Sequence, residues 1–475
     1  MDERKGFGSH FGFLMAAVGS AVGLGNIWGF PNKMGANGGF LFLIIYLILA
    51  ALCGYIIMVG ELALGRKTGR GAVDTYRSLT KRFKWLGWLA ILSPFLILGF
   101  YCTLGGYCLK YMVLNVGNLF SASFGNNGLA SAEVFGNMLS NQGESVAYGL
   151  IFVLITLLIV AGGVSGGIEK FCSVGMPCLF FMLLIVIIRS CTLPGAVDGL
   201  KYMFVPGWAV ANGVIEKAPN FLEVLSSAGG QMFFSLSLGM GIMITYGSYL
   251  DKKENIEKNA LIILVCDTLI ALMAGLAVMP ARFALDPTGD IGGPKLLFIT
   301  MQNVFNTMGV VGYIFGIIFY LLVILAAVSS SISLLEVVVA HFVDKATENG
   351  KGDKRKVYSI IAGIACGLLC LLVCLDGLGG NGIAPYQLLH LPMANWNDNW
   401  LDFLDMLSEG LMMPLGALFM SICIGWELGV QVVDDECSLC GVRFKSRKFF
   451  NVCIKYITPI LMVLILYGQI HAFFL

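Results

Sequence analysis

The chain has 475 residues and a net charge of +1, with 57% hydrophobic and only 12% charged residues. A mean hydropathy of +0.83 excludes a soluble globular domain and indicates a membrane protein with many spans. The sequence has no long basic or acidic run, so nucleic acid is not an expected partner.

Eleven apolar segments are each long enough to predict a span of about 20 residues. They cover residues 11–36, 40–64, 86–115, 147–164, 171–190, 226–250, 258–280, 311–343, 357–375, 403–428 and 449–474. Lysine and arginine gather in alternate connections, whereas residues 111–168 and 377–442 contain neither. Because cytoplasmic loops are enriched in these residues, we expect a multi-pass plasma (inner) membrane protein in the lipid bilayer. Its N-terminus would be cytoplasmic and its C-terminus extracellular or periplasmic.

The first apolar segment contains an unusual stretch, residues 19–31. Gly19, Gly23 and Gly25 fall where a spanning helix should run without interruption, and since each costs about 1 kcal/mol relative to alanine, they predict a break. Backbone groups freed at membrane depth are tolerated where they line an enclosed cavity. With the side chain of Asn26, the freed carbonyls would form an oxygen-rich site for a small hard cation. The alternative is a helix kinked for close packing, since small residues are common at helix contacts in membranes.

A second interruption is predicted in the sixth segment, at residues 231–241. Ser235, Ser237, Gly239 and Gly241 occupy positions where leucine and valine would be expected. This interruption has the same place in segments six to ten as the first has in segments one to five. Interrupted spans in corresponding positions of two halves point to a transporter with a binding site near the middle of the membrane. Kinks made for packing alone would not need to match.

Two further segments carry polar groups at membrane depth. The eighth has consecutive hydroxyls at Ser329, Ser330 and Ser331, which either bind a ligand or bond back to their own helix. The seventh has Asp267 in an otherwise apolar run. An unpaired carboxylate in the membrane costs several kcal/mol, so Asp267 is expected either to face a bound cation or to be a protonated, hydrogen-bonded structural residue.

These motifs resemble those of the neurotransmitter:sodium symporter family, in particular its bacterial amino-acid transporters with eleven spans and the LeuT fold. The resemblance covers nearly the whole chain. It rests on Gly-x-Ala-Val-Gly-Leu-Gly-Asn-x-x-x-Phe-Pro at 19–31, Glu-Leu-Ala-Leu-Gly-Arg at 61–66, Phe-Phe-Ser-Leu-Ser-Leu-Gly at 233–239 and Ser-Ser-Ser-Ile-Ser at 329–333. It implies an all-α integral membrane protein with one transporter domain, 1–475. Within it the resemblance implies two inverted five-helix repeats, 11–190 and 226–428, broken helices 1 and 6, and an additional span at 449–474.

The resemblance also implies two Na⁺ sites. The first, between spans one and eight, would use Gly19, Val22, Ala326, Ser329 and Ser330. The second, against the substrate, would use Ala21, Asn26, Ser235 and Asp267. Many relatives have asparagine at the position of Asp267 and bind chloride nearby. An aspartate supplies the negative charge internally, so chloride is not expected as a cofactor.

The substrate implied by the resemblance is an amino acid held between the two breaks. Its site would comprise Ala21, Gly23, Leu24, Gly25, Ile97, Tyr101, Phe234, Ser235, Ser237, Met240, Ser330 and Leu334. The half-helix N-terminus at the first break suits the substrate carboxylate. The lining offers no acid or base to a charged side chain, and methionine adapts to varied shapes. We therefore expect a neutral, hydrophobic or aromatic L-amino acid.

An inner gate is implied at the cytoplasmic side. Arg4 and Asp344 would form its charge-assisted bond, with Phe7 and Tyr249 as flanking aromatics.

The outer gate departs from the family pattern. Relatives have a basic residue where this chain has Gly29, so the partner of Asp405 in the tenth span is left open. Lys33, one turn further on, is the candidate replacement.

Three other functions, those of a hydrolase, a sodium channel and a receptor or scaffold, fit the sequence less well. Residues 163–167 match the Gly-x-Ser-x-Gly motif of hydrolases, but that motif needs a strand before it, and here it falls in a short loop between spans, so no enzyme is expected. A sodium channel would need a continuous polar pore rather than a closed midplane pocket. A receptor or scaffold with this fold would be free to lose cation ligands, yet every predicted ligand position retains an oxygen. No motif bears on the oligomeric state.

Overall fold

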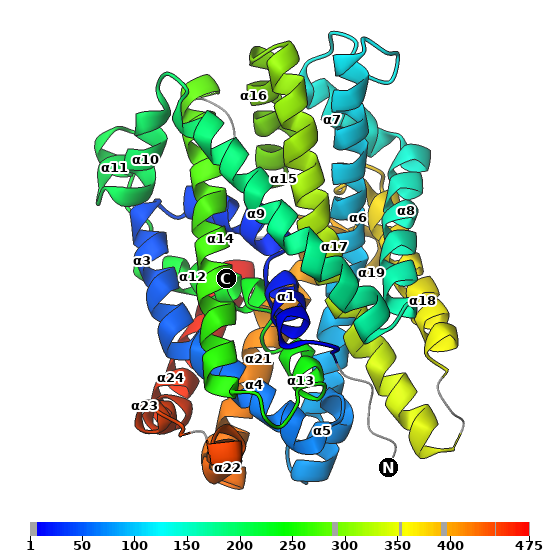
Figure 1. Ribbon diagram of the computed structural model, residues 1–475. Coiled ribbons are helices and arrows are strands. Elements are labelled where there is room, and N and C mark those ends of the chain that lie inside the picture. Colours follow the sequence, from blue (N-terminus) through cyan, green and yellow to red (C-terminus); the bar gives the residue numbers. More distant parts are fainter. Residues whose placement is uncertain (1–6, 287–292, 351–353, 391–396, 442, 475) are drawn as a thin grey trace.

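The computed structural model contains helices and no strands among the residues that it describes, which are 7–286, 293–350, 354–390, 397–441 and 443–474 (Figure 1). Arg4, the expected inner-gate arginine, lies outside the described residues.

Nine of the described helices are long and apolar enough to cross a membrane. They are α3–η2–α4 (Phe40–Thr68), α6 (Leu86–Leu119), α8 (Gln142–Ala161), η3–α9 (Val164–Cys191), α14 (Ile256–Leu285), α17 (Val310–Glu348), α18 (Arg355–Asp376), α20–η5–α21–η6 (Trp400–Leu428) and α23–η8–α24 (Arg447–Phe474). They correspond to the second to fifth and the seventh to eleventh predicted spans.

The first predicted span is broken. α1 (His10–Ala21) is followed by η1 (Gly25–Gly29) and α2 (Phe30–Ala36), and the two parts are bent by 44°. Val22 ends α1 because its backbone is extended, with φ −78° and ψ 94°. The break therefore falls inside the stretch where the glycines predict it.

The sixth predicted span is interrupted as well. α12 (Phe221–Ser235) and α13 (Ile242–Gly247) are separated by residues 236–241. Ser237, Gly239 and Gly241 have φ of 55°, 75° and 72°, in the left-handed region that glycine adopts readily and serine rarely. Neither half alone is long enough to cross a membrane.

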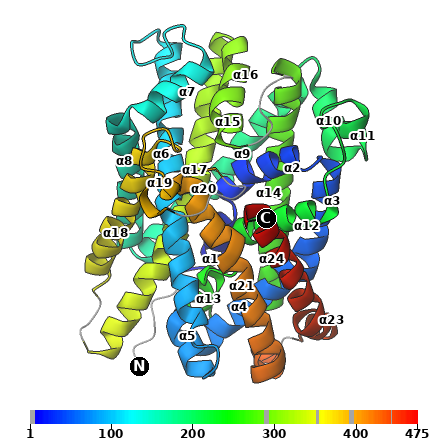
Figure 2. The same ribbon diagram turned by 180° about the vertical axis from the view of Figure 1, so that it is seen from behind.

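Shorter helices cover the two ends of the bundle. They are α5 (Ala72–Leu79), α7 (Ser131–Ser140), α10 (Ala196–Phe204), α11 (Trp208–Ala211), α15 (Gly293–Lys295), η4 (Leu296–Thr300), α16 (Met301–Thr307), α19 (Pro385–Leu389), α22 (Gln431–Cys437) and η7 (Leu439–Gly441). Both views show α7, α10 and α16 at one end, and α5 and α22 at the other end, where the chain begins (Figures 1 and 2).

The outer helices keep large apolar side chains exposed. Leu158, Ile188 and Leu368 are 62%, 65% and 64% exposed. Large exposed apolar surfaces mark sites of contact with a membrane or with another protein. In the interior, α17 packs against α6, α9 and α1, and this contact positions the site described next.

Candidate binding site

Backbone groups freed at the first break are bonded by side chains. The N–H of Leu24 donates to the Tyr101 hydroxyl of α6 (2.8 Å), and that of Gly23 donates to the side-chain oxygen of Asn26 (3.1 Å). The Gly25 carbonyl accepts a bond from Nε2 of Gln231 in α12 (2.7 Å). Because buried polar groups need partners, these bonds stabilise the break as a defined structure.

The second break is held in the same way and touches the first. The Ser237 hydroxyl donates to the carbonyl of Ser20 (2.9 Å), and the Gly239 N–H donates to Oε1 of Glu61 in α4 (2.8 Å). Glu61 is buried. It was noted in the sequence only as part of a motif, although a carboxylate inside an apolar span is a signal for such a role.

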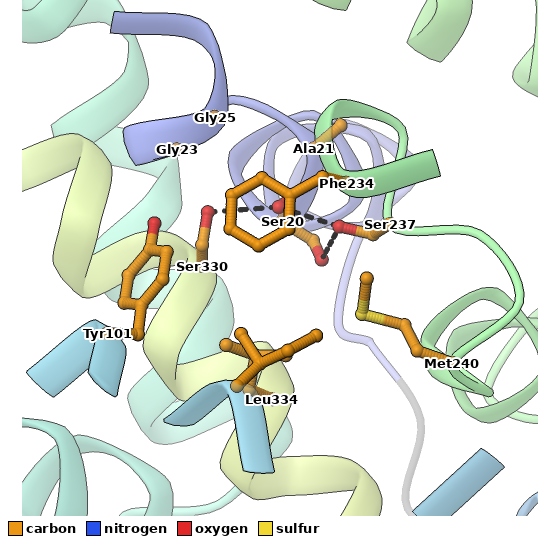
Figure 3. Close-up of a pocket in the computed structure, with 11 residues that line it drawn as sticks. Ser20, Ala21, Gly23, Gly25, Tyr101, Phe234, Ser237, Met240, Ser330 and Leu334 are labelled. Atoms are coloured by element: carbon orange, nitrogen blue, oxygen red, sulfur yellow. Dashed lines mark hydrogen bonds between the residues drawn. The ribbon is translucent and has the colours of Figure 1, made fainter. Parts of the chain in front are cut away.

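A pocket lies where the two breaks meet (Figure 3). It is lined by Ser20, Ala21, Gly23, Gly25, Ile97, Tyr101, Phe234, Ser237, Met240, Ser330 and Leu334. The structure thus brings together the predicted substrate residues except Leu24 and Ser235. Leu24 contributes its N–H to Tyr101, and Ser235 turns its hydroxyl to Asp267 (2.9 Å). Sequence reasoning missed Ser20, whose carbonyl accepts from the Ser237 hydroxyl (2.9 Å) and whose own hydroxyl donates to Ser237 (3.3 Å).

The pocket has an apolar wall and a polar backbone edge. Met240 and Leu334 form part of the wall (Figure 3), and Ile97 lines it as well. The ring centroids of Phe234 and Tyr101 lie 6.3 Å apart. A Cβ at Gly23 would lie 2.2 Å from the Ser330 Oγ, so this position has no room for a side chain. Among the described residues, none of those that line the pocket is charged. The pocket can therefore hold a ligand whose apolar side chain lies against the wall and whose polar atoms bond to the backbone groups of the other edge.

A first cluster of oxygens gathers between α1 and α17. The Ser329 Oγ lies 3.3 and 2.9 Å from the carbonyls of Val22 and Ala326, and the Ser330 Oγ lies 3.4 and 3.0 Å from those of Gly19 and Ser20. Neutral oxygens alone suit a hard cation of low charge. The Ser331 hydroxyl bonds to Thr156 (2.8 Å) and to its own helix at Val328 (3.0 Å). The bond of Ser329 to Ala326 is also made within its own helix, so the back-bonding alternative applies to both serines.

A second cluster surrounds Asp267, which is fully buried in α14. Its carboxylate accepts bonds from the Asn26 side-chain amide (2.7 Å), the Ser235 hydroxyl (2.9 and 3.0 Å) and the Tyr46 hydroxyl (3.3 Å). Ala21, the remaining member of this predicted set, lines the pocket. Sequence reasoning missed Tyr46, because an aromatic residue in an apolar span is typical of core packing.

All of these donors to Asp267 are neutral, and no ion pair among the described residues includes it. A buried carboxylate without a cation is costly. Asp267 and Ser235 place oxygens together, the ligand type that a hard cation such as sodium takes, whereas the Asn26 amide nitrogen faces Asp267 and its oxygen accepts from the Gly23 N–H (3.1 Å). The described residues contain no group of three or more His, Cys, Asp and Glu side chains that would suit a metal ion of higher charge.

Aromatic rings close the bundle toward the end where the chain begins. The Phe7 ring lies 5.9 Å from that of Tyr249, and the Tyr249 hydroxyl donates to Glu336 (2.6 Å). Arg355 binds both oxygens of Glu336 (2.6 and 3.0 Å). Asp344 accepts a bond from the N–H of Gly71 (2.9 Å). Sequence reasoning missed Glu336 and Arg355.

At the opposite side of the pocket, Lys33 in α2 forms an ion pair with Glu409 in η5. The expected acidic partner, Asp405, lies one turn earlier in the same span and takes part in no ion pair within the described part of the chain. Lys33, the candidate replacement, therefore pairs with Glu409 and not with Asp405, and sequence reasoning missed Glu409.

The hydrolase-like motif does not follow a strand, as it does in hydrolases. Residues 163–167 lie at the start of η3–α9, between two helices, and the structure describes no strand before them.

Comparisons with known proteins fit this geometry. A family profile described as the sodium:neurotransmitter symporter family matches residues 4–125 and 130–474. The chain is 34% identical over 477 residues to the sodium-dependent transporter YhdH of Bacillus subtilis (strain 168), with 98% of both chains covered. It is 24% identical over 531 residues to the sodium-dependent nutrient amino acid transporter 1 of Drosophila erecta, covering 98% of this chain and 77% of that protein. Among solved structures, MhsT in complex with L-phenylalanine matches with a TM-score of 0.83 and 34% identity, over 98% of this chain and 100% of that one.

Proposed function

Because the chain belongs to the sodium:neurotransmitter symporter family, whose members are sodium-coupled transporters and not enzymes, we propose that it carries a neutral, hydrophobic or aromatic L-amino acid together with sodium. Transport would proceed by alternating access in the plasma membrane. The observation that carries this proposal is the pair of interrupted helices around an uncharged pocket, with the buried Asp267 held only by neutral donors.

Two sodium ions are proposed, one at each oxygen cluster. An ion beside Asp267 would compensate its charge and face the substrate carboxylate, whose other contacts would be the Tyr101 hydroxyl and the first-break amides. The positive end of the η1–α2 half-helix favours a carboxylate at that place. An ion between Ser329 and the Val22 carbonyl would hold α17 against α1.

The apolar wall supports the substrate class. A charged side chain would find no partner among the lining residues, and an unpaired buried charge is strongly disfavoured. The solved relative MhsT holds L-phenylalanine, an amino acid of the proposed class.

Chloride independence is part of the proposal. Asp267 provides one fixed negative charge beside Asn26 and Ser235, so an added anion is not needed to balance sodium. Uptake in gluconate medium should equal uptake in chloride medium. A collapse of uptake without chloride would overturn this part alone.

The test is uptake into proteoliposomes. An inward sodium gradient should drive accumulation of labelled leucine or tryptophan but not glutamate or lysine, and a potassium gradient should not. Since about 2.3 kcal/mol is gained per charge moved through 100 mV, uptake should rise with an inside-negative potential. Sodium flux without amino acid would favour a channel, and absence of both fluxes would favour a scaffold.

The proposal includes the inverted repeats at 11–190 and 226–428 and a cytoplasmic N-terminus. Each repeat would contain one broken helix, α1–α2 in the first and α12–α13 in the second. Antibody access to epitopes added at the two ends of the chain, in sealed inside-out and right-side-out vesicles, tests the orientation.

A further inference from the structure

The connection between α5 and α6 exposes three basic side chains within four residues. They are Lys81, Arg82 and Lys84, and we call them the basic turn. No ion pair within the described part of the chain includes any of the three. Arg70, which lies just before α5, is instead bound to Glu348. The positive charge of the basic turn therefore remains available to a partner outside the chain.

The buried residues of this connection hold it in one position. The Thr80 side-chain oxygen accepts the N–H of Phe83 (3.1 Å), and its hydroxyl donates to Glu427 in η6. The ring of Phe83 lies 6.1 Å from that of Phe419 in α21. Since Thr80 and Phe83 are both buried, one side of the connection is fixed against the tenth span. The basic side chains, which are exposed, lie on the other side.

Exposed aromatic side chains follow the basic turn directly. Trp85 precedes α6, Trp88 lies in its first turn, and Leu92 lies one turn further on. The three side chains are 42%, 57% and 49% exposed, and their spacing of three and four residues puts them on one face of the helix. The ring centroid of Trp85 lies 5.2 Å from that of Phe419, and that of Trp88 lies 5.3 Å from that of His341. Both indole rings are therefore held in place although they are exposed.

The order of these side chains matches the layers of one membrane surface. Tryptophan is enriched at the level of the lipid headgroups, with apolar residues beside the acyl chains and lysine and arginine on the cytoplasmic side. Figures 1 and 2 both show α5 at the end of the bundle where the chain begins. The basic turn thus lies where lipid phosphates would be found, and α6 continues from it along the acyl chains.

We propose that the basic turn, together with Trp85 and Trp88, binds the headgroup of an anionic phospholipid. The lipid phosphate would lie against the three cations and the acyl chains along the exposed face of α6. The inference goes beyond transport and rests on the proposed function only for the orientation, which places this end in the cytoplasmic leaflet. Anionic lipids give that leaflet a negative surface potential, which attracts basic segments next to a membrane span.

A second basic cluster provides a matched comparison. It consists of Arg443, Lys445 and Lys448, which are exposed and have the same number of arginines and lysines as the basic turn. Carboxylates lie beside this cluster: Glu257 accepts the N–H of Lys445 (3.0 Å), and Asp434 is bound to Arg447 (3.0 Å). These negative charges repel an anionic headgroup. A general attraction of basic loops to the membrane would make the two clusters equivalent, whereas a site at the basic turn would not.

The test is native mass spectrometry of the full chain in detergent, with phosphatidylglycerol or phosphatidylcholine added. Phosphatidylglycerol should bind more tightly than phosphatidylcholine. The triple variant Lys81→Gln, Arg82→Gln, Lys84→Gln should weaken binding of the first phosphatidylglycerol by about 100-fold, since each cation near an anionic surface contributes about fivefold. Its binding of phosphatidylcholine should not change. The variant Lys81→Arg, Arg82→Lys, Lys84→Arg keeps all three charges and should bind phosphatidylglycerol within about twofold of the unaltered chain.

The control is the triple variant Arg443→Gln, Lys445→Gln, Lys448→Gln, which should weaken binding of phosphatidylglycerol by less than about threefold. Size-exclusion chromatography checks the fold of each variant. The proposal is overturned if the two neutral variants lose equal affinity, or if the charge-conserving variant binds as weakly as the neutral one. Displacement of the lipid by an excess of glycerol phosphate would also overturn it, because the site would then take a free phosphate group. Absence of amino-acid uptake would contradict the proposed function, while lipid binding would still decide this site.

Discussion

Substitution of Asp267 by asparagine separates the charge of this side chain from its shape. The carboxylate is fully buried and accepts bonds from Asn26, Ser235 and Tyr46 at 2.7 to 3.3 Å. Asparagine has nearly the same volume and can keep the bond from Asn26, but it offers sodium a neutral oxygen. A polar contact to a charged group contributes about 1.5–3 kcal/mol to stability, whereas one between neutral groups contributes about 1 kcal/mol. The carboxylate is also unpaired when sodium is absent, so its removal stabilises the sodium-free protein.

The weaker contact to sodium and the greater stability of the sodium-free protein both lower the affinity for sodium. Replacing the charged contact by a neutral one costs about 0.5–2 kcal/mol, and removing an unpaired buried carboxylate from the sodium-free protein adds about 1 kcal/mol. We expect the sodium concentration for half-maximal binding of labelled L-phenylalanine to rise by about 10- to 150-fold in Asp267→Asn, which corresponds to the sum of about 1.5–3 kcal/mol. In potassium, the melting temperature should rise above that of the unaltered chain. A scintillation proximity assay and thermal unfolding in detergent measure the two effects. Sodium affinity within about threefold of the unaltered chain, in a variant that folds, would refute the assignment of Asp267 as a sodium ligand.

Three further substitutions test the site and one ion pair outside it. Gly23→Ala would place a methyl group 2.5 Å from the Tyr101 hydroxyl and should abolish amino-acid binding, whereas Gly136→Ala, at a position with open space, should not; size-exclusion chromatography checks the fold of both. Tyr101→Phe removes the acceptor of an N–H at the first break and should weaken binding by about tenfold, measured by equilibrium binding in saturating sodium. The imidazole of His341, 3.7 Å from Asp74, holds the pKa of this carboxyl below its usual range. The stability that Asp74 contributes is therefore present above the unfolded-state pKa of about 4 and is lost as pH falls through the lower folded-state value. The melting temperature of Asp74→Asn should accordingly fall less below pH 4 than that of the unaltered chain, and equal losses would contradict the role of this pair.

The sequence predicts the broken helices and most of the pocket because polar and glycine residues are conspicuous in apolar spans. Gly23 and Gly25 lie where a spanning helix would have residues of higher helix propensity. Ser330 and Asp267 lie at a depth in the membrane where polar side chains are energetically costly. Each is informative before any contact is known. The structure places all of them at or beside the crossing of the two breaks.

Other contributors have no such signal. Tyr46 binds Asp267 through its hydroxyl, yet the rest of the side chain is apolar and fits an ordinary core position. Ser20 acts through its carbonyl, which every residue type possesses. Gln231 fills the space beside Gly29 and bonds to the Gly25 carbonyl, and these contacts join segments about 200 residues apart. Such features follow from tertiary packing, which local patterns do not encode.

The first break also explains why sodium and substrate should bind as a unit. Consecutive residues from Ser20 to Val22 face different partners: the Ser20 carbonyl accepts from Ser237 and Ser330, and the Val22 carbonyl faces Ser329. Ser330 itself belongs to both the pocket lining and the first oxygen cluster. A ligand that fixes any one of these contacts therefore fixes the position of α1 relative to α17 for the others. Since coupling between two binding equilibria is reciprocal, sodium must raise substrate affinity by the same factor as substrate raises sodium affinity. Under the proposed function, this geometry would couple the two binding events through the placement of one short segment, without direct contact between an ion in the first cluster and the amino acid.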